Sequence, residues 1–518
     1  MLAAWLATVS PMTVVWAQQT NADLNDSQEE ILLTDEDLDG QDDVDQFGNN
    51  RLRRSDVQFS TSLDDEETDE ESADVEEDPS RYNAVGRNIV DSETSGRGNQ
   101  RARAAQQVGI IQPDGSVTPL ANQPAAPVQG GTLQSEGSPY SALGIRIGTF
   151  NLFPVLTQSI GSTTNAELAR DGSSAFFSQT DARLTAVSDW SLHELRGEVG
   201  GTYLAYFDSS ADDLPTFDAS LELRVDHGND FTSRFGIGYD LTTESAESDN
   251  LTVPPPLMVV ERPNVHQLNG FAEVEKRAGS FSASMRGSIT ETIYEGAALS
   301  DSSNLSQGDR TNTLYEIQAR AGYELSASFQ PFVEASVGAR QYRQEIDRNG
   351  NRRDSMLYAL RTGVEFDRGE KLNGEISVGY ATEQFEDSAI DDLNGLTVDA
   401  SINWSPQRLT TFTATAQSVF TGSTNANESG SVTYAMSLNA VHDLRPNLSL
   451  NARVLASLRD YDDAGRQDRL LQGQLGAEWR LNRTAAVIAT VGHEIQDSTD
   501  NGSSYDATTA RVGLRLQR

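Results

Sequence analysis

The residues with the clearest spacing for chemistry are four aspartates near the N-terminus. Asp35, Asp37, Asp39 and Asp43 occupy positions 1, 3, 5 and 9 of a D-x-D-x-D-G pattern that has glycine at the sharp turn. This is the carboxylate spacing of a Ca²⁺ loop. Position 12, which normally supplies a bidentate carboxylate, is Gln46. The run therefore predicts either a weak Ca²⁺ site or a solvated acidic stretch, and we expect no other cofactor.

Other kinds of site chemistry are poorly represented. The chain has no cysteine, which excludes disulfides, a thiol nucleophile and a cysteine-ligated metal. No two of the five histidines stand at metal-binding spacing, and neither a nucleophile elbow nor a glycine-rich phosphate loop occurs. We therefore expect no catalytic residue and no enzymatic activity.

The composition restricts the partners and the fold. With 39 basic and 78 acidic residues the net charge is −39, and so acidic a chain repels phosphate backbones and disfavours nucleic-acid binding. No run of about 18 apolar residues occurs, so no transmembrane helix is expected. The composition therefore leaves open an envelope or secreted protein that lacks long apolar runs.

Residues 1–17 have the features of a secretory signal peptide. They are uncharged and mostly apolar, and Val15-Trp16-Ala17 places small residues at the two cleavage positions. The usual basic stretch in front of them is absent, so we expect the natural start to lie upstream. Residues 18–142, here called the acidic arm, hold 27 acidic residues against 8 arginines. This balance predicts disorder and rapid proteolytic loss of the arm.

From residue 143 onward, apolar and polar residues alternate. In one such stretch Phe231, Phe235, Ile237 and Tyr239 alternate with polar or small residues, which is typical of a strand with one apolar and one polar face. Short turns alternate with longer loops along the chain, so each strand is joined to its neighbour as a hairpin. The pattern predicts an all-β fold over 143–518, a transmembrane antiparallel up-and-down barrel of about 18 strands (16–18).

A soluble β-sandwich also alternates, but two features favour the barrel. Charged residues stand at mid-strand on the polar face, and aromatic residues recur eight apart on the apolar face. Eight strand residues span about 20 Å along the membrane normal at a tilt of about 40°, near the height of the apolar band. Both members of a pair can then lie in the interfacial girdles; the pairs are Phe231/Tyr239, Tyr315/Tyr323, Tyr358/Phe366 and Phe412/Phe420.

The start and the end of this region carry two recognisable motifs. Residues 144–154 read G-x-R-x-G-x-F followed by Pro154, which resembles the opening strand of the beta-barrel porin family of Gram-negative outer membranes. Near the C-terminus, Arg511, Gly513 and Leu516 are similar to the insertion signal of such barrels, although Arg518 stands where an aromatic residue is usual. The resemblance covers about 143–518. It implies a place in the outer membrane, contact with its lipid and assembly by the barrel insertion machinery.

The predicted polar face is the candidate functional site. A barrel of about 18 strands is too wide for side chains to fill, so this face would line an aqueous pore. It carries 14 acids and 12 bases, which predicts a weak preference for cations. Alternatively, opposite charges pair across neighbouring strands and brace the wall. The candidate pore-lining residues are Glu198, Glu222, Arg224, Arg234, Arg286, Arg320, Glu334, Arg361, Glu375 and Arg453.

We therefore expect an outer-membrane channel for passive diffusion of small hydrophilic solutes. Two alternatives stay open. One is a conduit for polysaccharide export, in which the acidic arm, in the periplasm, docks a periplasmic partner. The other is a surface scaffold or adhesin that acts through its outer loops. The sequence does not identify the solute or the oligomeric state.

The loop at 244–264 differs from the other outer loops. It carries Leu251 and Val253, then three prolines and the apolar run 257–260. An exposed apolar run is a liability in water, so it should be covered. It is expected either to fold inward or onto the rim and narrow the pore, or to contact a partner or another subunit.

Overall fold

The computed structural model describes residues 111–123 and 139–518, apart from 208, 210, 245–247, 252, 254–255, 370, 427, 463–464 and 501. The expected signal peptide, the Asp35–Asp43 pattern and most of the acidic arm lie outside the described residues. Every feature described below belongs to one compact unit, Gly86–Arg518.

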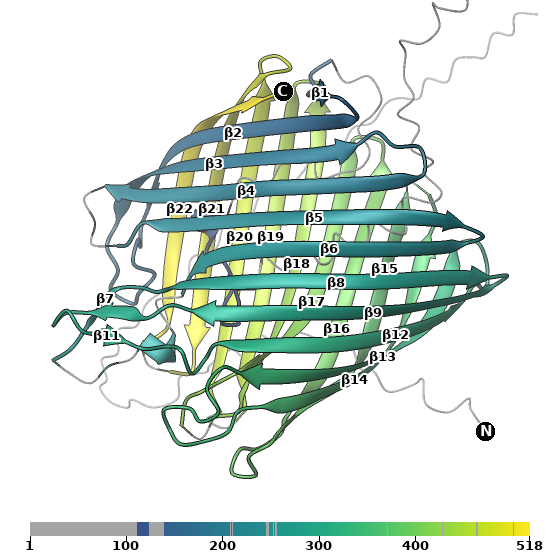
Figure 1. Cartoon of the computed structure of the whole chain (residues 1–518). Helices are drawn as coiled ribbons and strands as arrows, with labels where there is room; N and C mark the ends of the chain where they lie inside the picture. The colour runs from purple at the N-terminus through teal and green to yellow at the C-terminus, as the bar shows by residue number, and fades with distance from the viewer. Residues whose placement is uncertain are drawn as a thin grey trace, which may run out of the picture. The chain divides into compact units, whose positions relative to one another are not determined.

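In the described part of the chain, one antiparallel sheet of nineteen strands closes into a barrel (Figure 1). The short β1 (Ile145–Ile147) only forms a hairpin with β2. Closure is made by β2, where Ile160 lies opposite Ser178 on one side and Val512 on the other. The predicted fold class, with about 18 strands, is confirmed. The strands of the barrel wall are β2 (Phe150–Thr163), β3 (Ala175–Ser188), β4 (His193–Phe207), β5 (Leu214–Gly228), β6 (Phe231–Thr243), β8 (Asn264–Ala278), β9 (Phe281–Tyr294), β12 (Asn312–Tyr323), β13 (Phe329–Tyr342), β14 (Ser355–Asp367), β15 (Leu372–Phe385), β16 (Leu393–Gln407), β17 (Thr410–Gly422), β18 (Gly430–Arg445), β19 (Leu448–Tyr461), β20 (Gln467–Arg480), β21 (Ala485–Ser498) and β22 (Tyr505–Gln517).

The connections alternate in length, so the two ends of the barrel differ. Short turns such as the one between β8 and β9, where Gly279 has a φ of +60°, lie at one end. A residue without a Cβ adopts this left-handed conformation at little cost. The longer connections lie at the other end, here called the loop end. Because the strand number is even, β2 begins and β22 ends at the short-turn end. Among the described residues, no helix is long and apolar enough to span a membrane.

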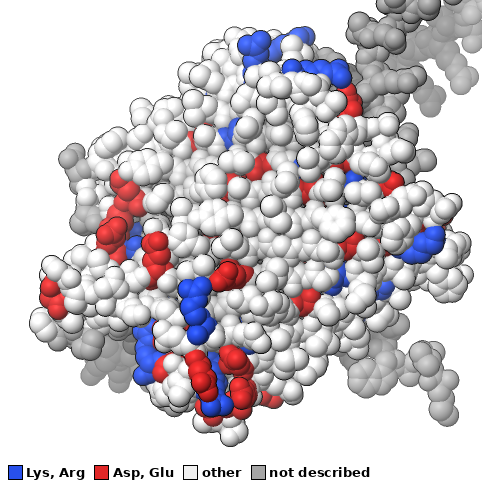
Figure 2. All heavy atoms as spheres, viewed as in Figure 1, with Lys and Arg blue, Asp and Glu red and all other residues white. Residues whose placement is uncertain are grey.

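The two faces of each wall strand have opposite character. On β13, Val333 and Val337 are about half exposed on the outside (53% and 47%), whereas Glu334 between them is 2% exposed on the inside. On β12 the aromatic pair Tyr315 and Tyr323 also points outward. Figure 2 shows the outer surface over the middle strands as largely uncharged, with charged side chains gathered toward the loops. This is the distribution that a lipid-facing wall requires.

The loop at 244–264 does not fold inward at its apolar run. β7 (Val259–Glu261) pairs with β10 (Ala297–Leu299), and β10 pairs with β11 (Asn304–Leu305). This small sheet projects from the loop end (Figure 1), and Met258 and Val260 are exposed. The expected constriction by this run is therefore not observed, while the expected partner contact stays a prediction. Among the described residues of this loop, the base with η3 (Asp249–Leu251) is tucked in, since Leu251 is buried.

Residues 111–123, here called the lumen segment, lie inside the barrel although they belong to the acidic arm for which we predicted disorder. Ile111 and Val117 form an antiparallel bridge around a turn in which Gly115 has a φ of +82°. Asp114 accepts hydrogen bonds from the backbone and the hydroxyl of Ser116 (2.9 and 2.6 Å). The short 3-10 helix η2 (Leu120–Asn122) follows, and all of its residues are buried.

The assignment of faces predicts how an arginine is tolerated on β17. Ala416 faces outward near the middle of the strand, beside the exposed Met436 of β18, and the adjacent Thr415 faces inward beside Ser437. Ala416→Arg should lower the free energy of unfolding by about 2–4 kcal/mol, because a guanidinium at the bilayer midplane is poorly solvated. Thr415→Arg should lower the free energy of unfolding clearly less, since its charge reaches the polar interior. Urea unfolding in lipid vesicles measures both, and equal costs would contradict the assigned faces.

Candidate functional site: the charged lumen

All ten candidate residues lie on the inner face of the wall. Their strands bring most of them together in ion-pair clusters, because residues directly opposite on neighbouring strands face the same side. Arg453 is the exception. Within the described residues it has no ion pair, and its Nε donates to no acceptor. Its cross-strand neighbours, Asn439 and Gln474, are both neutral.

The first cluster is centred on Glu334. The register of β12, β13 and β14 places Glu334 between Arg320 and Arg361, and it forms an ion pair with each, at 2.7 Å from Oε2 to Arg320 Nε. Arg320 Nη1 also reaches Glu375 Oε2 on β15 at 3.0 Å. Its guanidinium stacks over the ring of Phe332, 3.8 Å from the centroid. The four charges thus brace one section of the inner wall.

The second cluster lies on β6, β8 and β9. Arg234 Nη1 is 3.1 Å from Glu273 Oε1 and 3.3 Å from Glu275 Oε2. Arg286 approaches the other oxygen of Glu273 at 3.5 Å. Glu222 on β5 interacts electrostatically with both arginines. Removing one partner here would leave a charge poorly compensated.

Smaller pairs complete the inner face between β3 and β6. Arg183 bonds Glu198 and lies 3.2 Å from Asp218, and Arg224 pairs with Asp226 at 3.1 Å. The inner face of β16 to β18 carries fewer charges, Asp399 on β16 among them. Next to Asp399 it carries hydroxyl and amide groups that bond one another, as in Thr415–Ser437 (2.8 Å); we call Asn403, Thr413, Thr415, Ser437 and Asn439 the neutral strip.

Sequence reasoning missed the lumen segment as part of this site. It touches the wall at widely separated strands. Thr433 on β18 donates its hydroxyl to the carbonyl of Gly115 (2.9 Å), and Tyr294 on β9 donates to the carbonyl of Pro113 (3.4 Å). A turn sequence, Pro113-Asp114-Gly115, between two β-branched apolar residues was the available signal, but the surrounding composition obscured it.

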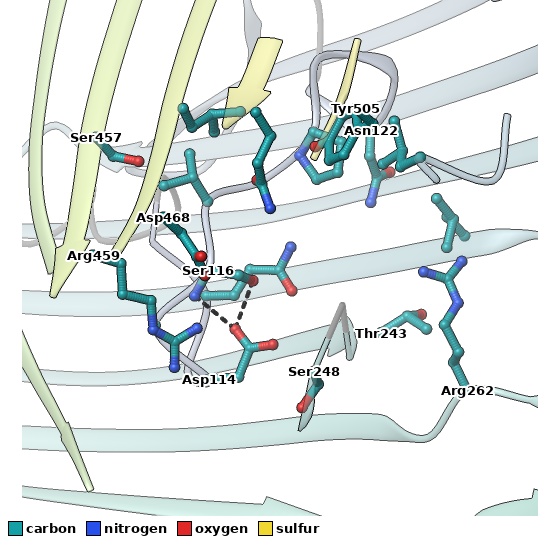
Figure 3. A pocket seen from close by; sticks show the side chains of 18 of the residues that line it. Asp114, Ser116, Asn122, Thr243, Ser248, Arg262, Ser457, Arg459, Asp468 and Tyr505 are labelled. Carbon is teal, nitrogen blue, oxygen red and sulfur yellow. Dashed lines mark hydrogen bonds between the residues drawn. The ribbon is translucent and has the colours of Figure 1, made fainter. Parts of the chain in front are cut away.

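The second half of the lumen segment is held by polar groups of β20, β21 and β22. Glu494 accepts the backbone N–H of Leu120 (2.9 Å), and Arg511 Nη2 donates to the carbonyl of Gln123 (3.0 Å). Gln472 accepts from the side chain of Gln123 (2.9 Å) and donates to the carbonyl of residue 118 (3.1 Å). All of these wall side chains are buried. The first half of the segment borders a remaining cavity of about 60 Å³. Figure 3 shows Asp114 and Ser116 of the segment between Arg459 and Arg262.

Arginines also tie the outer loops together above the lumen. Arg310 Nη1 donates to Glu244 Oε1 (2.6 Å), and burial raises the pKa of Glu244 although Arg310 opposes that rise. Arg348 bonds Asp309 (2.7 Å). Arg353 pairs with Asp347 (2.8 Å). We call these six residues the mouth network. Arg353 also donates to the carbonyls of residues 425 (2.8 Å) and 428 (2.5 Å), which joins two loops.

The described residues contain no group of three or more His, Asp or Glu that could hold a metal ion. The Ca²⁺ pattern at Asp35, Asp37, Asp39 and Asp43 lies outside the described residues and stays a prediction. Most of the described inner wall carries charged or hydrogen-bonding side chains.

A closed barrel with an apolar outer belt and a polar, ionised interior defines the class of outer-membrane porin-like barrels. The chain belongs to the family described as "Putative beta-barrel porin 2", whose model matches residues 138–518. No curated protein matches the chain. The expected family is confirmed, and the family and fold together support a place in the outer membrane.

Several solved barrels are similar to this chain. The copper transporter OprC has 9% identity and a TM-score of 0.41, with 72% of this chain and 81% of that one covered. The outer membrane protein OpdK from Pseudomonas aeruginosa has 11% identity and a TM-score of 0.37, covering 71% and 98%. The siderophore receptor PirA from Pseudomonas aeruginosa has 9% identity and a TM-score of 0.34, covering 71% and 80%. The family assignment rests on the sequence match alone.

The mouth network predicts unequal roles for two adjacent arginines. Arg353 is 1% exposed in a buried pair, whereas Arg352 forms exposed pairs with Glu345 and Glu386. Arg353→Met should loosen loops 343–354 and 423–429, because breaking a buried pair costs about 3–5 kcal/mol. Arg352→Met should change little, as exposed pairs contribute about 0–1 kcal/mol. Hydrogen exchange of the two loops checks this, and similar exchange in both variants would contradict the network.

Proposed function

We propose that the barrel is an outer-membrane channel for passive diffusion of small hydrophilic solutes. The observation that carries the proposal is the inner wall, where charged and polar side chains continue from the short-turn end to the mouth network. A closed barrel of this strand number is too wide for its own side chains to fill, so water occupies what the lumen segment leaves free. Paired charges make such a lumen polar while keeping its net field small.

A second candidate is a conduit for polysaccharide export. The neutral strip on β16 to β18 favours it, since adjacent hydroxyl and amide groups match the hydrogen-bonding groups of a glycan. In this version the acidic arm lies in the periplasm and docks a partner there. A surface scaffold or adhesin, which needs no open lumen, is the third class. The proposal assigns no catalysis to the chain.

The test uses a variant in which residues 111–123 are replaced by a Gly-Ser stretch of equal length, because the lumen segment occupies the pore. In a planar bilayer this protein should give stable single-channel currents. Folded protein that carries no current would reject both transport functions and leave the scaffold. Neutral oligosaccharides distinguish the other two: block times that grow with oligosaccharide length support the export conduit, and their absence supports simple diffusion.

The charge balance of the lumen predicts its selectivity. The lining predicted from the sequence has 14 acids against 12 bases, so the Gly-Ser variant should prefer cations weakly. Adding Arg453→Gln should increase that preference, because this guanidinium has no carboxylate partner among the described residues. Asn451→Gln, on the same face of β19, is the neutral control. Reversal potentials in a salt gradient measure the shift, and marked anion preference would contradict the proposed lining.

A further inference from the structure

The wall beside the lumen segment is apolar where a water-filled pore would be polar. Phe177 on β3, Leu204 on β4 and Leu214 on β5 all point inward, and their exposed fractions are 0%, 0% and 6%. They form one buried hydrophobic cluster with Ala121 of the lumen segment, and Tyr206 packs against this cluster. Large apolar side chains facing water would be unfavourable. This apolar patch therefore favours a bound group that covers it.

Next to this apolar patch, on β20, β21, β22 and β3, the wall is polar and bonds the lumen segment. Glu494 accepts the Leu120 N–H and also the side-chain amide of Gln472 (3.0 Å). Arg511 and Gln179 both donate to the carbonyl of Gln123, at 3.0 and 3.5 Å. The bonds to the segment reach its backbone or the side-chain amide of Gln123. The wall thus contacts a short peptide through main-chain hydrogen bonds and through a neighbouring apolar patch.

The segment also extends across the lumen rather than along one wall. Its contacts run from β9 at Pro113, through β18 at Gly115, to β20–β22 and β3–β5 at residues 118–123. In the order of strands around the barrel, β12 to β17 separate the first two contacts. Asp114 interacts electrostatically with Glu244 and Arg310 of the mouth network. The segment therefore lies across the loop-end half of the lumen, joined to both walls.

We propose that this inner surface is a peptide-binding seat and that the lumen segment, residues 111–123, is its own plug. The seat is made by Phe177, Leu204, Leu214, Gln472, Glu494 and Arg511. With the plug seated, solutes do not cross the loop-end half of the barrel; when it leaves, the lumen opens. This inference rests on the proposed channel function and adds its regulation.

The first experiment adds a synthetic peptide with the sequence of residues 111–123 to the Gly-Ser variant in a planar bilayer. The peptide should block the current in a saturable way. For a peptide carrying Leu120→Asp, the concentration that gives half block should be about tenfold higher, because this peptide buries a charge beside the seat. A scrambled peptide should not block the current. Equal effects of all three peptides, or no block by the native one, would overturn the seat. If the Gly-Ser variant itself carries no current, the channel function fails instead.

The second experiment locks the plug in the full chain, which has no native cysteine. A Cβ at Gly492 would lie 2.9 Å from Leu120 Cδ1, so Leu120→Cys with Gly492→Cys places two thiols within reach of each other. Oxidised molecules should stay closed, because the plug cannot leave, and reduction should make channel openings at least tenfold more frequent. Each single-cysteine variant is a control, and its current should not change when the reductant is added. Thiols that do not pair, or equal currents before and after reduction, would overturn the proposal.

Discussion

The structure depends on one constraint, which is that every backbone polar group inside a membrane must find a partner within the protein. Antiparallel pairing satisfies all strands except the first and last, and β2 and β22 satisfy each other, with Thr163 opposite Thr509 and Val155 opposite Gln517. Closure removes the sheet edges. It also fixes the side-chain arrangement, since alternate residues of each strand then face either lipid or an enclosed lumen.

The enclosed lumen explains the charge distribution. Charges on the inner face are removed from bulk water, and for most of them the register supplies a partner across neighbouring strands, as where Glu334 lies between Arg320 and Arg361. Where the inner face is apolar, at Phe177, Leu204 and Leu214, it forms a buried cluster with the chain's own Ala121. The same enclosure thus accounts for ion pairs in one part of the wall and a bound peptide in another.

Much of this architecture could be predicted from local patterns, because a period of two fixes which face each side chain occupies. All ten candidate charges lie on the inner face for that reason. The ion-pair partners of these residues could not be predicted, since pairing depends on the register between strands. A shift of the register by one residue would place different side chains opposite each other. The position of the lumen segment inside the barrel could not be predicted for a different reason. Its contacts, such as Leu120 with Glu494, join residues far apart in the chain, and its acidic, proline-rich surroundings are typical of disorder.

The most direct test of the arrangement is a density map of the full chain in lipid nanodiscs by electron cryo-microscopy. It should show Arg320, Glu334 and Glu375 facing the lumen and residues 111–123 lying between Thr433 and Arg511. A map with these charged side chains facing lipid, or with a lumen that is empty beside Phe177, Leu204 and Leu214, would contradict it.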